Sequence, residues 1–260
     1  MSPTGISADL RAALVAAAQT ERLLVASDYD GCISPIVSRP EDAVPNPASI
    51  TAIEELGGLR DTAVAVVSGR ELAVLSELSG LTPPVTLVGS HGSEFDTGFV
   101  IEITPERQAL LNRIIDELRS IAADYPGAMV ETKPASTTLH VRNVTGDAEA
   151  ALERVRSGPA SWSGVEVTEG KSIIELAVID TSKGHALDIL RDRTDSGAVI
   201  YLGDDVTDEK AFAHLRPESG DVGIKVGSGD TAAQFRVGDP DDVASVLEVL
   251  AAQRREWLSR

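Results

Sequence analysis

Two aspartates stand directly after an apolar run near the start of this 260-residue chain. Asp28 and Asp30 follow "RLLVAS" (22–27), a run typical of a buried strand, and only one residue separates them. Two carboxylates this close raise each other's cost of ionisation unless a cation lies beside them. The pair therefore predicts a cationic partner at the end of this strand.

Other apolar runs also end in residues that bind phosphate or metal. "TAVAVVS" (62–68), "VTLVGS" (85–90) and "AVIYLG" (198–203) each lead into such a group. The groups are Ser68, Gly69 and Arg70; Gly89, Ser90, His91 and Gly92; and Asp204, Asp205 and, a turn later, Asp208. Lys183 begins the helix that precedes the last of these strands. Because ligands of an open parallel sheet bind beyond the carboxyl ends of its strands, we expect these groups to gather in one site.

The chemistry of the expected cluster favours a hard cation and a phosphate. Carboxylates at this density, with no set of Cys or His beside them, suit an oxygen-binding ion, and Mg²⁺ is the usual one where phosphate shares the site. A serine, a lysine and glycine-rich backbone supply the donors that a phosphate accepts. A metal and a phosphoryl group together would compensate Asp28 and Asp30.

The order of the apolar patterns predicts an α/β fold. A fifth strand is expected at "DVGIKV" (221–226), and helical patterns lie between the strands. The expected helices are 47–58, 70–79, 183–193, 207–215 and 240–256. Ser182 and Thr207 stand where helix N-caps are expected. Strands that alternate with helices indicate a Rossmann-like parallel sheet covered on both faces.

The middle of the chain has a different pattern, which predicts an inserted α+β domain. A long amphipathic helix (105–123) precedes two pairs of β segments separated by a helix at 146–157. The β segments are 128–133, 137–143, 165–170 and 172–178, with a hairpin turn at Glu169-Gly170. We therefore expect a core of residues 1–104 and 177–260, and an inserted cap of residues 105–176.

Charged side chains recur on the β segments of this expected cap. They are Glu131, Lys133, His140, Arg142, Lys171 and Glu175. Charges on strands usually mark a solvated sheet face, but such a face could also bind sugar hydroxyls. Both interpretations stay open on the sequence.

The motifs resemble those of a known superfamily. "DYDG", "SGR", "SKG" and "GDDVTDE", in this order, resemble the four motifs of the haloacid dehalogenase superfamily of phosphotransferases. Within it the chain looks most like the trehalose-6-phosphate phosphatases. That closer resemblance rests on "DYDGCISPIV", "PEDAVPNP", "VSGR", "GSHGSE", "HVR" and "EGKSIIEL" together with "GDDVTDE".

The resemblance implies a role for each motif residue. Asp28 would attack phosphorus and form an aspartyl-phosphate, and Asp30 would act as general acid and base. Lys183, with Ser68 and Gly69, would hold the phosphoryl oxygens. The implied Mg²⁺ ligands are Asp28, the backbone carbonyl of Asp30 and Asp204, supported by Asp205 or Asp208. The implied substrate-binding residues are Arg70, His91, Gly92, Glu94, Glu131, Lys133, Arg142 and Glu175, although a loop histidine would equally explain His91.

Two positions depart from the family pattern. Cys32 stands after the first motif, where the superfamily usually has Thr or Val. The chain also reads "ELAVID" from Glu175, where trehalose-phosphate phosphatases commonly have Arg-Pro after the glutamate. The second departure bears on the sugar and not on phosphate chemistry.

The composition of the chain limits which classes of partner are expected. The formal net charge is −18, and Lys and Arg form no cluster, so neither nucleic acid nor an anionic membrane is an expected partner. No apolar stretch approaches the ~20 residues of a membrane span. "LRAALVAAAQ" (10–19) lacks a basic leader and predicts a first helix and not a signal peptide. A single cysteine fits a reducing cytoplasm, and we expect a monomer that acts on a small sugar phosphate.

Three alternatives remain beside trehalose 6-phosphate hydrolysis. The same chemistry could act on another sugar ester, such as glucosylglycerol phosphate or mannosylphosphoglycerate. A phospho-acceptor receiver module also gathers acidic residues and a lysine, but it is about half this length and has no inserted cap. A degenerate regulatory subunit would lack a motif, and here all four are present.

Overall fold

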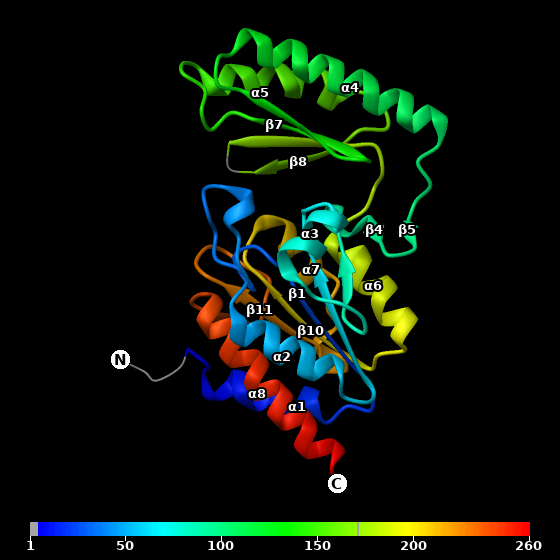
Figure 1. The fold of residues 1–260 in the computed structure, drawn as a ribbon, viewed down its shortest axis with the longest axis vertical. Coiled ribbons are helices and arrows are strands. Elements are labelled where there is room, and N and C mark those ends of the chain that lie inside the picture. The colour runs from blue at the N-terminus through cyan, green and yellow to red at the C-terminus, as the bar shows by residue number, and fades with distance from the viewer. Residues whose placement is uncertain (1–4, 171) are drawn as a thin grey trace. The chain divides into compact units, whose positions relative to one another are not determined.

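The chain folds into two compact units, each described by itself. The computed structural model describes residues 5–170 and 172–260. One unit contains the chain up to Gly98 together with Thr181–Arg260, and the second contains Phe99–Asp180 (Figure 1). The second unit is therefore an insertion between two segments of the first.

The first unit is built on a six-stranded parallel sheet with the strand order β12-β11-β10-β1-β2-β3. Its strands are β1 Leu23–Ser27, β2 Thr62–Val67, β3 Thr86–Val88, β10 Ala198–Gly203, β11 Val222–Val226 and β12 Phe235–Val237. Its helices are α1 Ala8–Ala18, α2 Pro47–Gly57, α3 Leu72–Ser79, α6 Lys183–Thr194, α7 Val206–Ala213 and α8 Pro240–Leu258. A separate two-stranded hairpin consists of β4 Glu94–Phe95 and β5 Gly98–Phe99, the last residue of which belongs to the second unit.

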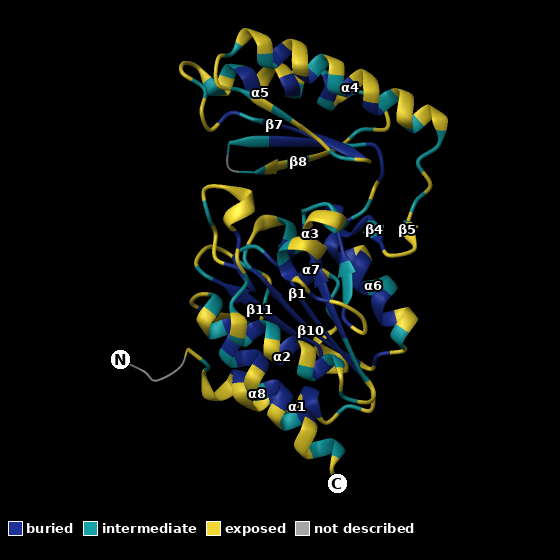
Figure 2. Cartoon of the chain, viewed as in Figure 1, coloured by how far each residue is buried: buried dark blue, intermediate teal, exposed yellow. Residues whose placement is uncertain are grey.

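Helices cover both faces of the parallel sheet because its strands are apolar on both sides. Successive strand residues point to opposite faces, so Leu23 and Val25 join one core while Leu24 and Ala26 join the other. The first core also contains apolar residues of α1, α2 and α8, and the second contains those of α6 and α7. All five residues of β1 are buried (Figure 2). The sheet can thus hold charged groups rigidly at its carboxyl edge.

The second unit is a four-stranded antiparallel sheet covered on one face by two helices. The sheet order is β6-β7-β9-β8, from β6 Met129–Thr132, β7 Ser136–His140, β8 Glu166–Gly170 and β9 Ile173–Ala177. Helices α4 Pro105–Asp124 and α5 Ala148–Ser157 pack on it through residues such as Ile114 and Val155. Leu139, Ile174 and Leu176 face these helices, so the alternate strand residues line the other face.

The α/β fold, with its parallel sheet and an added antiparallel layer, confirms the fold predicted from the sequence. Strand β12 and the β4–β5 hairpin escaped prediction, because both are very short. Ser182 is the N-cap of α6 as expected, whereas the predicted Thr207 cap is wrong. Helix α7 begins one residue earlier, after Asp205. Glu169 and Gly170 belong to β8, so the turn predicted at these two residues is wrong.

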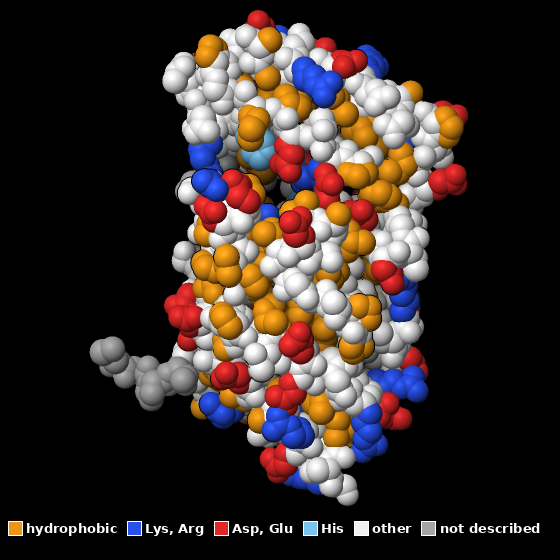
Figure 3. Space-filling view, viewed as in Figure 1, with side chains coloured by type: hydrophobic (Ala, Val, Ile, Leu, Met, Phe, Trp, Pro, Cys, Tyr) orange, Lys and Arg blue, Asp and Glu red, His pale blue; other side chains and the backbone are white. Residues whose placement is uncertain are grey.

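The surface carries charges of both signs. On the face shown in Figure 3, basic side chains are scattered among acidic ones. Among the described residues, no helix has both the length and the apolar character needed to cross a membrane.

Candidate active site

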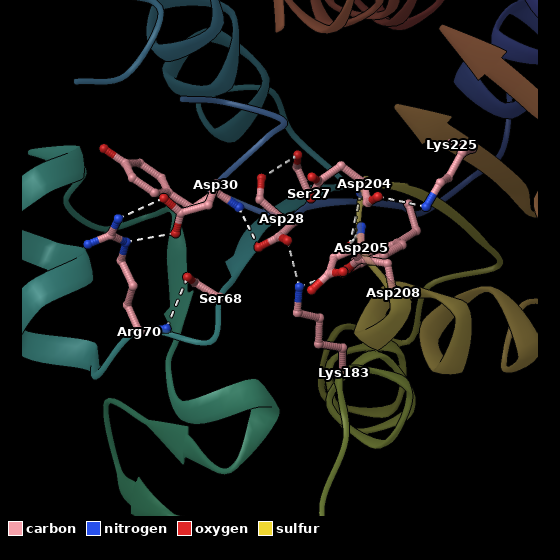
Figure 4. A network of polar contacts seen from close by, with 12 residues as sticks. Ser27, Asp28, Asp30, Ser68, Arg70, Lys183, Asp204, Asp205, Asp208 and Lys225 are labelled. Carbon is pink, nitrogen blue, oxygen red and sulfur yellow. Dashed lines mark hydrogen bonds and ion pairs between the residues drawn. The ribbon is translucent and has the colours of Figure 1, made fainter. Parts of the chain in front are cut away.

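The end of β1 places Asp28 at the centre of a buried polar cluster. The Asp28 N–H donates to the Leu202 carbonyl of β10 at 2.9 Å, which continues the sheet pairing one residue beyond the strand. One carboxylate oxygen, Oδ1, accepts the Tyr29 N–H at 2.7 Å. The other oxygen is directed at Lys183 (Figure 4). Backbone geometry thus fixes the orientation of this carboxylate.

Lys183 is the cation that compensates Asp28. Its Nζ lies 2.7 Å from Asp28 Oδ2 and 2.8 Å from Asp208 Oδ1. A lysine at the first position of a helix opposes the helix dipole, so these carboxylates must stabilise it. Burial alone would lower the pKa of Lys183, but Asp208 and Asp28 outweigh burial and raise that pKa above its ordinary value. Lys183 therefore stays protonated and positively charged.

Asp208 is the anchor of the cluster. Its Oδ1 accepts from Lys183 and from the Tyr201 hydroxyl at 2.6 Å, and its Oδ2 accepts the N–H groups of Asp204 and Asp205 at 2.9 Å each. Burial would raise the pKa of Asp208, but Lys183 and these other donors lower it. The side chain is fully buried and keeps its negative charge. Tyr201 could not be recognised from the sequence, because it resembles one more apolar strand residue there.

Three carboxylates can hold a metal ion. Oxygens of Asp28, Asp204 and Asp208 lie within 4.8 Å of one another, and among the described residues this is the group of acidic, His or Cys side chains with that geometry. Burial and the Asp208 charge raise the pKa of Asp204 to about 7 against the opposing charge of Lys183. Burial likewise raises the pKa of Asp28 well above its ordinary value. These three carboxylates offer only oxygen ligands, and their negative charge exceeds the positive charge beside them. They therefore fit a hard divalent cation.

Gly31 brings the first motif against this set. Its φ of +79° is the left-handed region, and a Cβ there would lie 2.1 Å from Asp204 Oδ2. Only glycine lets the turn after Asp30 approach the Asp204 carboxylate so closely.

Lys225 is a second buried lysine, and it is not among the predicted site residues. Its Nζ donates to the Asp204 backbone carbonyl at 2.7 Å and lies 3.6 Å from Glu209 Oε1. A lone lysine in a strand whose residues are otherwise apolar and buried was the available signal. Lys225 holds the turn that carries Asp204.

Asp30 points away from the metal group and pairs with Arg70 (Figure 4). The guanidinium binds both carboxylate oxygens, with Nε–Oδ2 and Nη2–Oδ1 distances of 2.7 Å. Arg70 also donates to the Pro40 carbonyl at 3.0 Å. Among the described residues, the carboxylates of Asp30 and Asp205 lie outside the three-carboxylate group, while Asp208 lies within it.

The predicted phosphate-binding residues lie at the end of β2, and the predicted loop residues follow β3. Ser68 is buried, and its hydroxyl accepts the Arg70 N–H at 3.2 Å. The His91 ring packs so closely on Gly69 that a Cβ on Gly69 would lie 2.4 Å from His91 Cε1. Glu94 accepts the Leu72 N–H at 2.9 Å and so caps α3.

The second unit gathers most of its predicted site residues on the sheet face away from its helices. Glu131, Thr138, Glu175 and Thr168 form one row across the four strands. Glu131 Oε2 lies 2.8 Å from His140 Nε2, and that hydrogen bond lowers the pKa of Glu131. Glu175 Oε1 accepts from Ser136 at 2.6 Å and from Lys133 at 3.2 Å.

Two other charged residues were also expected on this unit. Arg142 lies two residues beyond the end of β7 and is exposed. Lys171 lies outside the described residues.

Cys32, the departure in the first motif, is fully buried, and burial raises its pKa well above the ordinary value. Its thiol is therefore protonated and shielded.

Comparison with known proteins identifies the family. The family model described as Trehalose-phosphatase matches residues 26–241. The chain belongs to the trehalose-phosphatase family. It is 30% identical over 237 residues to the trehalose-6-phosphate phosphatase of Escherichia coli, an alignment that covers 88% of each chain. The resemblance seen in the motifs is thereby confirmed.

Two further comparisons show how much of each protein the similarity covers. The chain is 35% identical over 241 residues to the trehalose-phosphate phosphatase of Mycobacterium marinum, covering 87% of this chain and 60% of that protein. A solved C-terminal domain of Candida albicans trehalose-6-phosphate phosphatase shares the fold, with a TM-score of 0.79 over 96% of this chain and 99% of that domain, at 24% identity. The chain thus corresponds to part of the mycobacterial relative and to a complete solved domain.

Proposed function

We propose that the chain is a Mg²⁺-dependent phosphatase that hydrolyses trehalose 6-phosphate to trehalose and inorganic phosphate. The observation that carries the proposal is Lys183 bridging Asp28 and Asp208, with Asp204 in the same carboxylate group. A buried nucleophile, a phosphate-binding cation and a metal-binding set are the parts that phosphoryl transfer requires. Family membership supports the choice of substrate.

The reaction would proceed in two displacements. Asp28 Oδ attacks phosphorus, the bond from phosphorus to the sugar oxygen breaks, and Asp30 gives its proton to the leaving oxygen. Asp30 then takes a proton from water, which attacks the aspartyl-phosphate and releases phosphate with Asp28 regenerated. Since Arg70 occupies both oxygens of Asp30, one of these hydrogen bonds must break before Asp30 can protonate the sugar.

The remaining core residues would bind and orient. Ser68, Gly69 and Lys183 hold the phosphoryl oxygens, with the positive charge of Lys183 maintained by its two carboxylate partners. Mg²⁺, when bound by Asp28, Asp204, the Asp30 backbone carbonyl and Asp208, supplies charge neutralisation at the phosphoryl group. Lys225 and Tyr201 keep Asp204 and Asp208 in place. Asp205 contributes through its N–H to Asp208.

Sugar recognition would come largely from the second unit. Its polar row supports roles for Glu131, Lys133 and Glu175, with Arg142 as a further candidate, because sugar hydroxyls need paired donors and acceptors. In the first unit, Arg70 is the residue proposed beside the substrate, while the turn of His91, Gly92 and Glu94 adjoins the loop of Ser68 and Gly69. We also propose that the chain works as a monomer in the cytoplasm. The single cysteine supports a reducing compartment.

A phosphate-release panel tests the proposal. The wild-type protein with Mg²⁺ is assayed on trehalose 6-phosphate, glucosylglycerol phosphate, mannosylphosphoglycerate and p-nitrophenyl phosphate, with Asp28→Asn as the inactive control. We expect the highest kcat/KM on trehalose 6-phosphate. A higher value on another ester would reassign the sugar, and no release from any ester would favour a regulatory module.

A further inference from the structure

The turn Gly89–Glu94, here called the 89–94 turn, connects two of the motifs that handle phosphate. Its Ser90 N–H donates to the Arg70 carbonyl at 2.7 Å, and its His91 N–H donates to the Ser68 carbonyl at 2.9 Å. On the other side, a Cβ on Gly92 would lie 2.5 Å from the Ser182 carbonyl oxygen. The turn therefore touches both the loop of Ser68 and the helix start of Lys183.

The backbone of this turn is strained. Ser90, His91 and Gly92 have φ values of +50°, +55° and +101°, so three successive residues adopt the left-handed region. Side chains such as those of Ser90 and His91 disfavour that conformation, which persists only where the surroundings over-determine it.

The surrounding contacts supply that constraint. The Glu94 carboxylate accepts from the Ser90 hydroxyl at 3.2 Å as well as from the Leu72 N–H. The Ser93 hydroxyl donates to the Ser90 carbonyl at 2.7 Å. The His91 ring presses on Gly69, the residue between Ser68 and Arg70. Both side chains that the motif resemblance associated with the substrate thus have structural contacts within the core.

We infer that the backbone of the 89–94 turn is a strut that sets the separation between Ser68 and Lys183, with Glu94 as a positioning residue and with neither Glu94 nor His91 as a sugar ligand. The inference rests on the proposed function only in taking Ser68 and Lys183 as phosphate-binding groups. A displacement of about 1 Å in such groups can cost ~10²-fold in rate, so a rigid strut has a clear use.

Two sets of variants test the strut. Gly92→Ala places a methyl against the Ser182 carbonyl, and its matched control is Gly220→Ala, which has a similar φ of +89° but open space around the new Cβ. Gly69→Ala places a methyl against the His91 ring, and Gly69 is not among the positive-φ glycines, so alanine suits its backbone. The rescue variant is Gly69→Ala with His91→Gly, which removes the ring and relieves the strain at residue 91.

The readouts separate positioning from sugar binding. For each folded variant we measure its melting temperature, its Kd for inorganic phosphate in Mg²⁺ by calorimetry, and kcat/KM on p-nitrophenyl phosphate and trehalose 6-phosphate. We expect Gly92→Ala and Gly69→Ala to weaken phosphate binding by about tenfold or more and to lower kcat/KM on both esters by the same factor. Gly220→Ala should leave phosphate binding unchanged, and the double variant should regain most of what Gly69→Ala loses.

Three results would overturn the strut: unchanged phosphate affinity in the folded glycine variants, a double variant no better than Gly69→Ala, or a loss confined to trehalose 6-phosphate. If Gly92→Ala does not fold, the comparison of Gly69→Ala with the double variant Gly69→Ala, His91→Gly decides whether the turn is a strut. If the wild-type protein binds phosphate but does not hydrolyse trehalose 6-phosphate, the proposed substrate is wrong. The strut is then judged from the phosphate affinities of the variants alone.

Discussion

The charged groups of the two units are built in different ways. In the first unit the Lys183 and Asp208 side chains are 2% and 0% exposed, and Asp208 accepts four hydrogen bonds. In the second unit the Glu131 and His140 side chains are 48% and 29% exposed. The first arrangement is part of a packed core, while the second lies on an open sheet face.

This difference predicts different consequences of mutation. Removing one partner of a buried ion pair leaves an uncompensated charge in a low-dielectric interior, which strongly destabilises a protein. An exposed pair contributes little to stability because water screens it. Substitutions of buried pairs should therefore damage folding and chemistry together, whereas substitution of an exposed residue such as Glu131 should change only what the protein recognises. The Lys133–Glu175 pair on the same sheet face, whose side chains are each 8% exposed, belongs with the buried pairs.

The largest effect is expected for the proposed nucleophile. Asp28→Asn keeps the size of the side chain but cannot attack phosphorus, so kcat should fall by more than about 10⁴-fold on every ester. Rapid-quench assays with mass spectrometry should also find no phosphorylated protein. Turnover within tenfold of wild type would remove Asp28 from the proposed role.

The next largest effect is expected for Lys183→Met. Loss of the cation should cost about 3–5 kcal/mol of unfolding free energy, because Asp28 and Asp208 lose their shared partner. It should also lower kcat/KM by about 10²-fold or more through lost phosphate binding. Urea denaturation and p-nitrophenyl phosphate assays measure the two losses.

Arg191→Met is the matched control for Lys183→Met. Arg191 lies on the same helix, α6, and forms a buried ion pair with Asp221 that contains none of the site residues. We expect a comparable loss of stability with kcat/KM retained at temperatures where the variant is folded. Equal losses of activity in both variants would mean that Lys183 acts only through the fold.

Metal removal should make stability depend on pH with a defined sign. The pKa of Asp204 is about 7 in the folded chain against an ordinary 3.8, so the folded state binds more protons between these values and loses stability as the pH rises through that window. In EDTA, the wild-type melting temperature should fall from pH 4 to about pH 7 relative to that of Asp204→Asn, which cannot titrate. Mg²⁺ should reduce this fall, and a difference independent of pH and of Mg²⁺ would argue against the metal group.

The smallest effect is expected for Tyr201→Phe. The substitution removes the hydroxyl that donates to Asp208 but keeps the ring. The ring packs edge-on against that of Phe212, with 5.7 Å between the two ring centroids. Asp208 keeps its other donors, so the loss of stability should be about 1.5 kcal/mol, with kcat/KM within about fivefold. A loss of activity like that of Lys183→Met would mean that Tyr201 does more than hold Asp208.

The sequence was sufficient to predict the parallel sheet and the gathering of the motif residues at its carboxyl edge. Runs such as "LLVAS" are apolar on both faces, as the strands of a covered parallel sheet are, and parallel strands bring Asp28, Ser68 and Asp204 to one edge. Lys183 was expected in the same cluster, but its ion pair with Asp28 was not predicted.

The sequence could not reveal how these residues are held. Tyr201 and Lys225 lie inside apolar strands, and their partners appear only when β10 and β11 meet α7 and the turn at Asp204. The bidentate pairing of Arg70 with Asp30 joins residues 40 positions apart. The left-handed backbone of His91 also has no sequence pattern of its own, because a histidine favours other conformations.

The central claim is that the first unit performs the chemistry on any phosphate ester while the second selects the sugar. Its most direct test is the ratio of kcat/KM on trehalose 6-phosphate to that on p-nitrophenyl phosphate, measured for wild type and Glu131→Ala. Losing one charged hydrogen bond to the sugar costs about 1.5–3 kcal/mol, so the ratio should fall ten- to a hundredfold. The value on p-nitrophenyl phosphate and the melting temperature should stay unchanged. An unchanged ratio, whether both activities fall together or neither falls, would contradict the claim.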